Sequence, residues 1–272
     1  IIQEAEKDFD YKQYDHTYNN RNYKDISSAV AIATVKTAYS SQAQAIFTYT
    51  SSGFTSRMIS RFRPHIPIIS LTGSKKTYHQ LALVWGVVPV LRNYTTMEEA
   101  FDAATCYTLQ QGYVHYGDMV LVTAGTPFGV RGTTNMMLIK SIGQVIVRGE
   151  PNKGKHVYGQ ALFILVHDKT YEVEGKILVL SHCDRHYESF IKSAAGVVLQ
   201  NFEDDKESEL CLLELGLKYH VPVVVRAESA CSLIKEGEWI TLDPNKGLVF
   251  RGTVSTEEEV LKKVCQVHPK NL

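Results

Sequence analysis

The stretch TYTSSGFTSRMISRFRP, residues 48–64, carries the clearest structural signal in this chain. It begins at the end of an apolar run, residues 45–49, that predicts a β-strand, and it continues into an amphipathic run, residues 54–62, that predicts a helix. Hydroxyl side chains and Gly53 lie between the two, as is typical of a tight strand-to-helix turn. Such a loop can present hydroxyls, backbone N–H groups and a helix N-terminus to a phosphate, although its commonest role is only to cap the helix.

The same stretch resembles the effector loop of the pyruvate kinase family. The family pattern is roughly T-x-S-G-x-[ST]-[AP]-R followed by I-S-[RK]-[YF]-R-P, and the two halves stand here at residues 50–57 and 59–64. Three further family segments follow in the expected order: PII at residues 67–69, QLALVWGV at residues 80–87 and GTTN at residues 132–135. The resemblance covers about half of the chain, and its motifs are specific in order and spacing.

The resemblance implies that this half binds a phosphorylated allosteric effector, either a sugar phosphate or a nucleotide monophosphate. The residues implied to contact that effector are Thr50, Ser51, Ser52, Gly53, Thr55, Arg131 and Gly132. The hydroxyls would donate hydrogen bonds to phosphate oxygens, and Gly53 would supply a backbone donor. Arg131 lies in a glycine-rich segment, residues 125–132, where it either reaches a second phosphate or is only solvated.

Composition indicates a globular protein without a membrane-spanning segment. The 272 residues suffice for one large or two ordinary domains, and 44% of them are hydrophobic. Lysine plus arginine and aspartate plus glutamate both number 29, so no basic excess indicates nucleic-acid binding. Five scattered cysteines without a Cys-x-x-Cys pair predict reduced thiols, no zinc site and a cytoplasmic location. The chain begins with isoleucine, which favours a fragment of a longer protein.

The first half predicts an alternation of strands and helices. The expected strands lie at residues 45–49, 66–71, 87–91, 118–123 and 135–142, and the expected helices at residues 2–9, 26–39, 54–62, 75–83 and 97–111. This alternation is typical of a largely parallel sheet in a three-layer α/β/α domain, which the resemblance makes one of the pyruvate kinase C-terminal type. Ligands of such sheets bind at the carboxyl ends of the strands, where the hydroxyl loop would lie.

Glycine, proline and charge gather at residues 149–155 (GEPNKGK), which predicts a linker. The predicted division of the chain is an effector-binding domain, residues 1–148, this linker, a second domain, residues 156–252, and a helix with a tail, residues 253–272.

The second half predicts a smaller β/α domain. Strands are expected at residues 161–166, 176–181, 196–199, 222–225, 238–242 and 247–250, with helices at residues 185–193 and 206–219. Four stretches resemble the swivelling phosphohistidine domain of phosphoenolpyruvate-utilising enzymes: residues 194–198, 216–225, 240–243 and 247–252. That domain carries its phosphohistidine where this chain has Cys211, behind the acidic residues 202–209. A role as phosphocarrier is therefore disfavoured, and Cys211 is expected in the core among neighbouring leucines.

The histidines of this chain do not form the pattern of a metal site. His182 and His186 have helical spacing but lack a carboxylate pattern such as His-Glu-x-x-His. Trp85 lies in a family motif that is structural, so burial is expected rather than contact with a sugar.

These observations together predict the regulatory C-terminal portion of a bacterial-type pyruvate kinase. The resemblance implies that the whole enzyme is a tetramer that transfers phosphate from phosphoenolpyruvate to ADP with magnesium and often potassium. Its catalytic (β/α)8 barrel would need about 250 residues of its own, so this chain alone is expected to be inactive and to need no cofactor. The alternatives are a free-standing protein that binds phosphorylated metabolites, and a phosphocarrier.

Overall fold

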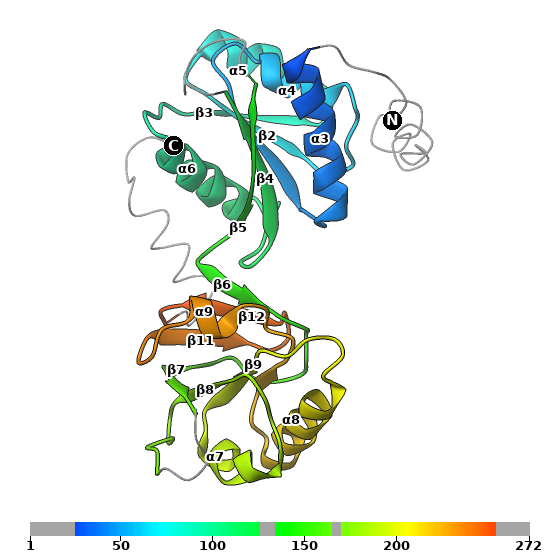
Figure 1. Ribbon diagram of the computed structural model, residues 1–272. Coiled ribbons are helices and arrows are strands. Elements are labelled where there is room, and N and C mark those ends of the chain that lie inside the picture. The colour runs from blue at the N-terminus through cyan, green and yellow to red at the C-terminus, as the bar shows by residue number, and fades with distance from the viewer. Residues whose placement is uncertain (1–24, 126–133, 165–169, 254–272) are drawn as a thin grey trace. The chain divides into compact units, whose positions relative to one another are not determined.

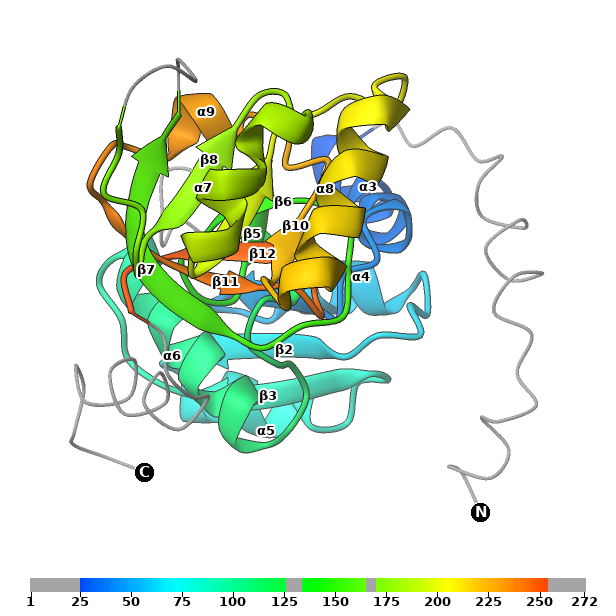
Figure 2. The ribbon, with the colours of Figure 1, turned by 90° about the horizontal axis from the view of Figure 1, so that it is seen from below.

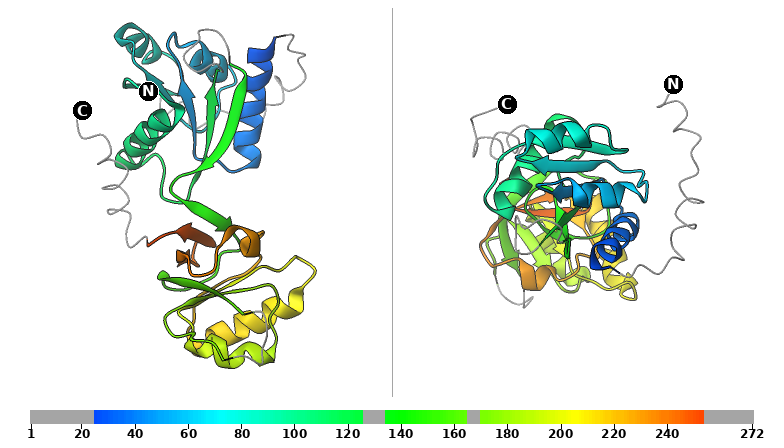
Figure 3. Two further views of the ribbon diagram at one scale, coloured as in Figure 1. Left: turned by 60° about the vertical axis from the view of Figure 1, so that its left-hand side comes forward. Right: turned by 90° about the horizontal axis from the view of Figure 1, so that it is seen from above.

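The computed structural model describes residues 25–125, 134–164 and 170–253. The chain divides into two compact units between Ile142 and Gly143, and each unit has its own sheet (Figures 1 and 3). Within the described residues, every helix is too short or too polar to cross a bilayer.

The first unit is built on a five-stranded sheet in the order β3-β2-β1-β4-β5. Its strands are β1 (Ala45–Tyr49), β2 (Ile68–Thr72), β3 (Val87–Leu91), β4 (Met119–Ala124) and β5 (Met136–Ser141). The first four run parallel, and β5 is antiparallel to β4. Every residue of β1 and β2 is buried, because both faces of these central strands are covered.

Helices cover both faces of this sheet. They are α3 (Ile26–Ser40), α4 (Phe54–Ser60), α5 (Lys75–Leu81) and α6 (Met97–Gln110). Side chains of α3, α4 and α5 share one apolar cluster with Ile46, while the next residue, Phe47, meets Phe101 of α6 with ring centroids 5.9 Å apart. Successive residues of a strand point to opposite faces, so α6 lies on the face away from the other three helices. The predicted three-layer α/β/α arrangement is confirmed (Figure 1).

Local sequence explains where two of these helices begin. Asp25 caps α3, since its carboxylate accepts a hydrogen bond from the Ser28 amide at 2.8 Å. Thr96 and Glu99 form a reciprocal capping box at the start of α6. The five strands and four of the five helices expected in this half are all present within a few residues of their predicted bounds. The fifth helix, predicted over residues 2–9, lies outside the described residues.

The second unit has a seven-stranded sheet in the order β10-β9-β8-β7-β11-β12-β6. Its strands are β6 (Val145–Arg148), β7 (Val157–Phe163), β8 (Ile177–Leu180), β9 (Gly196–Leu199), β10 (Val223–Val224), β11 (Trp239–Asp243) and β12 (Leu248–Arg251). The half from β7 to β10 is parallel, and the half formed by β7, β11, β12 and β6 is antiparallel.

The helices of this unit lie on both sides of the parallel half. They are the 3-10 turn η1 (Arg185–Tyr187), α7 (Glu188–Ser193), α8 (Lys206–Tyr219) and α9 (Ala230–Leu233). α7 and α8 lie side by side over one face and share an apolar core with it (Figure 2). A second apolar cluster, which includes Ala230 and Ile234, covers the other face.

The structure agrees only in part with the predictions made for the cysteines. Cys211 is partly buried against the core beneath α8, as predicted, although its neighbour Leu210 is exposed. Cys183, Cys211 and Cys231 are free thiols, whereas Cys106 is disulfide-bonded, so the expectation of reduced thiols throughout is wrong at Cys106. Sequence separation does not show which cysteines meet in the fold.

The predicted linker at residues 149–155 is wrong. These residues belong to the second unit: the Gly149 amide donates to the Gly247 carbonyl at 2.8 Å, and the Glu150 amide to the Val225 carbonyl at 2.9 Å. A Cβ on Gly149 would collide with the Val225 carbonyl oxygen. Gly149 is therefore required because two backbone segments approach closely there. A segment of this kind has the same glycine and proline content as a flexible linker, so composition alone does not distinguish the two.

Candidate functional site

The loop of residues 50–53 lies at a reversal of the sheet topology. The chain runs from β1 to β2 and β3 on one side, and it then returns through α6 to place β4 on the other side of β1. Helices that connect strands on the two sides of such a point lie on opposite faces, which leaves a crevice at the carboxyl ends of the strands. The loop follows β1 at that crevice, and Gly125 follows β4 there. Arg131 and Gly132 lie outside the described residues.

Thr50 and Gly53 give the loop its shape. The Thr50 hydroxyl is buried and accepts a hydrogen bond from the Gly53 amide at 2.9 Å, while the Thr50 amide donates to the Leu71 carbonyl at 3.0 Å. Gly53 has a φ of 76°, in the left-handed region. A Cβ at this position would lie 2.7 Å from Nη1 of Arg57. Glycine is thus required both by the backbone conformation and by the neighbouring guanidinium.

Thr55 is engaged with a residue far along the chain. Its hydroxyl lies 2.7 Å from the hydroxyl of Thr134, and both side chains are buried. Thr134 lies two residues before β5. This hydrogen bond joins the first turn of α4 to the chain segment that returns from the glycine-rich stretch.

Ser51 and Ser52 are the accessible hydroxyl residues of the loop. Ser51 is exposed and Ser52 is half-buried. Their carbonyl oxygens are held from outside the loop: that of Ser51 accepts from the Thr77 hydroxyl, and that of Ser52 from Nη2 of Arg57, both at 2.9 Å. The backbone of the loop is therefore fixed at each residue while two hydroxyls remain accessible at its surface.

Positive charge surrounds this loop. The Arg57 guanidinium lies against Ser52 and Gly53. Lys75 and Lys76 are exposed in the first turn of α5, directly before Thr77. Neither α4 nor α5 has an acidic residue in its first turn. The local electrostatic potential therefore favours an anion.

A buried cluster of hydroxyls holds α4 on the sheet beneath the loop. Oγ1 of Thr48 lies 2.8 Å from the hydroxyl oxygens of both Ser56 and Ser70, which lie 2.7 Å from each other. Nearby, burial raises the pKa of Tyr94 to about 12, and its hydroxyl donates to the Leu71 carbonyl at 3.2 Å. The phenol is neutral at physiological pH and adds no negative charge to the site.

Three residues that the sequence did not single out complete this arrangement: Arg57, Thr77 and Thr134. Arg57 and Thr134 both lie within the segments that resemble pyruvate kinase, so the sequence could have indicated them as site residues. Thr77 gave none beyond its place near a helix start, because its contact with Ser51 depends on how α5 packs.

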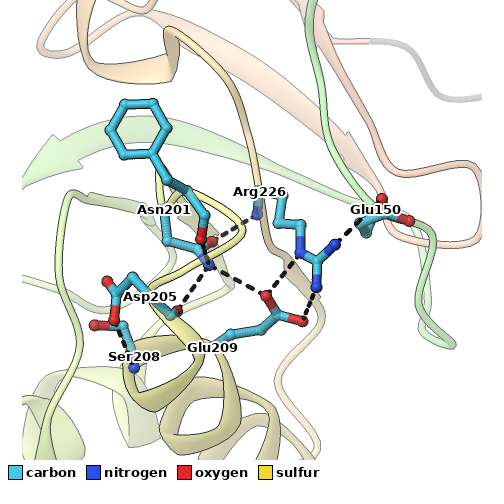
Figure 4. A network of polar contacts seen from close by, with 7 residues as sticks. Glu150, Asn201, Asp205, Ser208, Glu209 and Arg226 are labelled. Carbon is cyan, nitrogen blue, oxygen red and sulfur yellow. Dashed lines mark hydrogen bonds and ion pairs between the residues drawn. The ribbon is translucent and has the colours of Figure 1, made fainter.

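The second unit presents a different arrangement at the start of α8 (Figure 4). Asn201 is buried, and its amide nitrogen donates to the carbonyls of Phe202 and Asp205 and to the Glu209 carboxylate. Its side-chain oxygen accepts from the Arg226 amide at 2.7 Å. Glu209 in turn receives Nε of Arg226 at 2.8 Å and Nη2 at 3.2 Å. We call Asn201, Glu209 and Arg226 the clasp.

The clasp pairs Arg226 with carboxylates of the protein itself. Hydrogen bonds from Arg226, and from Asn201, lower the pKa of Glu209, so the carboxylate is ionised at neutral pH. Glu150 adds a second carboxylate, with 3.9 Å between its Oε1 and Nη1 of Arg226. The arginine is therefore already surrounded by carboxylates that belong to the protein.

An imidazole does lie near this helix in the folded chain, although the sequence has a cysteine at the position of the phosphohistidine. Nδ1 of His182, which follows β8, is 2.7 Å from the hydroxyl of Ser208 in the first turn of α8. The amide of Cys183 donates to the same hydroxyl at 3.2 Å. Burial raises the pKa of the Cys183 thiol, which keeps it protonated and unreactive.

Known proteins resemble this chain along most of its length. The family model for the α/β domain of pyruvate kinase matches residues 28–140. A pyruvate kinase from Lactobacillus delbrueckii subsp. bulgaricus is 34% identical over 256 residues, and one from Sporosarcina psychrophila is 32% identical over 255 residues. Both of these relatives are pyruvate kinases.

The alignment with each of these two pyruvate kinases covers 92% of this chain and 43% of the relative. The chain therefore spans less than half the length of the pyruvate kinases that it matches. A pyruvate kinase from Geobacillus stearothermophilus is 33% identical over 85% of the chain. The first unit thus matches the α/β domain of pyruvate kinase, as its motifs predicted, and the similarity to pyruvate kinases continues into the second unit.

Proposed function

We propose that this chain is the regulatory C-terminal portion of a glycolytic pyruvate kinase, and that its first unit binds a phosphorylated effector. The effector is a sugar phosphate or a nucleotide monophosphate. The observation that carries the proposal is the position of the loop of residues 50–53: it lies at the topological reversal between β1 and β4, and it has accessible serines beside Arg57.

The loop geometry supports a distinct role for each residue. Ser51 and Ser52 donate to phosphate oxygens from a fixed backbone, and Arg57 supplies a charge-assisted donor beside them. Thr50 and Gly53 shape the turn. Thr55 reaches the phosphate either directly, by exchanging its bond to Thr134, or through that pair. Arg131 and Gly132 are proposed to contact the far end of the ligand.

Catalysis belongs to the rest of the enzyme in this proposal. The whole protein transfers phosphate from phosphoenolpyruvate to ADP in the cytoplasm as an allosteric tetramer, with magnesium and potassium bound to its catalytic barrel. Within the described residues, no group of three or more histidines, cysteines, aspartates or glutamates is arranged to hold a metal ion. Effector binding here would act on the catalytic part by shifting the populations of two conformations.

The second unit is proposed to be a domain of the swivelling type that has lost phosphoryl transfer. Its parallel half and the helix α8 support the likeness, while the clasp occupies the place where a phosphate would need positive charge. Arg226 already faces two carboxylates there, which opposes the approach of an anion.

Calorimetric titration tests the proposal. Fructose 1,6-bisphosphate, ribose 5-phosphate, glucose 6-phosphate and AMP are added in turn to the purified chain, and at least one is expected to bind with micromolar affinity. Several charge-assisted hydrogen bonds of roughly 1.5–3 kcal/mol each are opposed by the cost of ordering, roughly 1–2 kcal/mol per residue fixed.

Two variants localise the binding. Ser52→Glu should abolish it, because a carboxylate at this half-buried position repels the phosphate. Ser41→Ala, which lies after α3 at the opposite edge of the sheet, should leave it unchanged. Failure of all four ligands to bind, or equal binding to Ser52→Glu, would show that the loop is only a helix cap.

A further inference from the structure

A cavity of about 850 Å³ lies in the first unit, away from the loop of residues 50–53. It is formed where strands begin: Ala43 and Gln44 precede β1, and Pro67 precedes β2. Tyr39 at the end of α3 and Tyr113 beyond the end of α6 complete its wall. In a parallel sheet the amino and carboxyl ends of the strands lie at opposite edges. This pocket is therefore at the edge opposite the candidate effector loop.

Aromatic side chains form much of the pocket wall. The rings of Tyr39 and His65 are stacked, with centroids 4.7 Å apart and planes 8° from parallel. The His65 amide also donates to the Tyr39 hydroxyl at 3.3 Å, which holds the pair together. Tyr113 is 39% exposed and stacks on Tyr107. Flat aromatic groups present the surface on which a planar ring binds well.

The pocket has no formal charge. Among the described residues that line it, none is an aspartate, glutamate, lysine or arginine. Burial lowers the pKa of His65, so the imidazole is neutral at physiological pH. α3 and α6 both end beside the pocket, and the carboxyl end of a helix carries partial negative charge. A phosphate is therefore disfavoured here, in contrast to the loop of residues 50–53.

The side-chain amide of Gln44 gives the pocket a means of orienting a ring. Nε2 of Gln44 donates to the Gln42 carbonyl at 3.0 Å, which orients this amide and leaves its oxygen as an acceptor. The combination of apolar walls with a few placed polar groups is the usual composition of a small-molecule site, and the volume is within the usual range.

We propose that this pocket binds an uncharged heteroaromatic ring, of the kind that a nucleoside carries. Tyr39, His65 and Tyr113 supply the stacking surface, and the amide oxygen of Gln44 accepts a hydrogen bond from a ring N–H or an exocyclic amine. This site is separate from the effector loop and does not depend on the function proposed for that loop.

The test is a titration of the purified chain with adenosine, followed by NMR of the backbone amides. Binding is expected with a dissociation constant on the order of 0.1 mM, the usual range for a ligand of this size. The largest shifts should fall on the amides of residues 42–44 and 112–113, and those of residues 50–53 should not move.

Two variants each remove one exposed aromatic ring from the stacking surface. Tyr113→Ala and His65→Ala should each weaken adenosine binding about tenfold, as expected for loss of one ring that stacks on a base. Tyr158→Ala, which removes an exposed tyrosine from the second unit, should have no effect. Circular dichroism of each variant shows whether it remains folded.

AMP separates this pocket from the effector loop. In a Ser52→Glu background, where the loop no longer takes phosphate, adenosine should bind as before and AMP should bind the pocket more weakly than adenosine. The proposal is overturned if adenosine fails to bind the wild type, if Tyr113→Ala and His65→Ala both bind it normally, or if the shifts map to residues 50–53.

Discussion

The two units each place a loop between the carboxyl end of a parallel strand and a helix, and they use it in opposite ways. The loop after β1 has small hydroxyl residues, and its neighbouring charges are those of Arg57, Lys75 and Lys76. The segment between β9 and α8 is acidic, and Glu209 in the first turn of α8 is bound by Arg226. The comparison shows that position at the end of a strand is not sufficient for an anion site, because the charges nearby must also remain uncompensated.

The largest effect is expected from removing the centre of the clasp. Asn201→Ala deletes hydrogen bonds from the buried Asn201 side chain to four groups and leaves the amide of Arg226 without its acceptor. We expect the free energy of unfolding of the second unit to fall by about 2–4 kcal/mol. Urea denaturation followed by fluorescence measures it, in a Trp85→Phe background where Trp239 alone reports.

Asn245→Ala is the matched control for this change. Asn245 is an exposed asparagine of the same unit that also bonds to backbone, donating to the Gly154 carbonyl at 2.8 Å. Its loss should cost under about 1 kcal/mol, because water replaces the lost partner. Equal losses for the two variants would show that the clasp is no more than a set of surface contacts.

A smaller effect is expected in the loop of the first unit. Gly53→Ala places a Cβ at a φ of 76° and 2.7 Å from Nη1 of Arg57, so it should destabilise the first unit by about 1–2 kcal/mol and weaken phosphate binding. Gly86→Ala is matched, since Gly86 has a φ of 68° with nothing within 4 Å of its Cβ. Both variants carry the backbone strain, but only the first displaces Arg57.

Calorimetry and denaturation of these two variants separate strain from recognition. If both lose ligand affinity equally, the guanidinium has no role in binding and the comparison with Arg226 fails.

The pH dependence of the clasp gives a third, smaller effect. The pKa of Glu209 is lowered from 4.5 in the folded state, so the stability that it contributes is present above 4.5 and is lost as the pH falls through the lower folded value. Glu209→Gln should cost about 1–2 kcal/mol at pH 7. The difference from wild type should shrink as the pH falls below 4.5.

Denaturation curves at a series of pH values measure that difference, and other carboxylates cancel because both proteins contain them. Glu207→Gln, an exposed position in the first turn of α8, should show a small difference without this trend. A Glu209→Gln difference that stays constant down to pH 3 would contradict the assignment.

The last expected result is the absence of an effect. Incubation with phosphoenolpyruvate should leave residues 153–252 without a phosphoryl group, because the acidic segment repels the donor and Cys211 packs against the core. Mass spectrometry under conditions that preserve labile adducts is the measurement. A phosphoryl group on Cys211 or His182 would show that the second unit is a working phosphocarrier.

Much of the first unit could be predicted because its signals are local. The buried strands β1 and β2 read as short apolar runs, and the turn at Gly53 combines hydroxyls with the one residue that tolerates its backbone angle. The contacts of the site were not predictable in the same way. The bond between Thr55 and Thr134, and the approach of His182 to Ser208, join residues that only the folded chain brings together.

The missed elements have a related cause. β6 is only four residues long and directly precedes a segment whose composition matches a linker, so its pairing with β12 was not visible in the sequence. α9 has four residues and begins beside Ser229, whose φ of 62° no pattern indicates. In both places tertiary contacts, rather than local preference, determine the structure.

The pairing of β6 with β12 affects where the second unit could be joined to another protein. β6 is the terminal strand of its sheet, and it covers the backbone groups of Leu248–Arg251. A recombination event that joined the second unit to a new partner at residue 149 would leave this apolar strand as a bare edge, open to pairing with other chains and to aggregation. Fusion before Gly143 would carry the covering strand along, so that short turn is where such a module can be inherited intact.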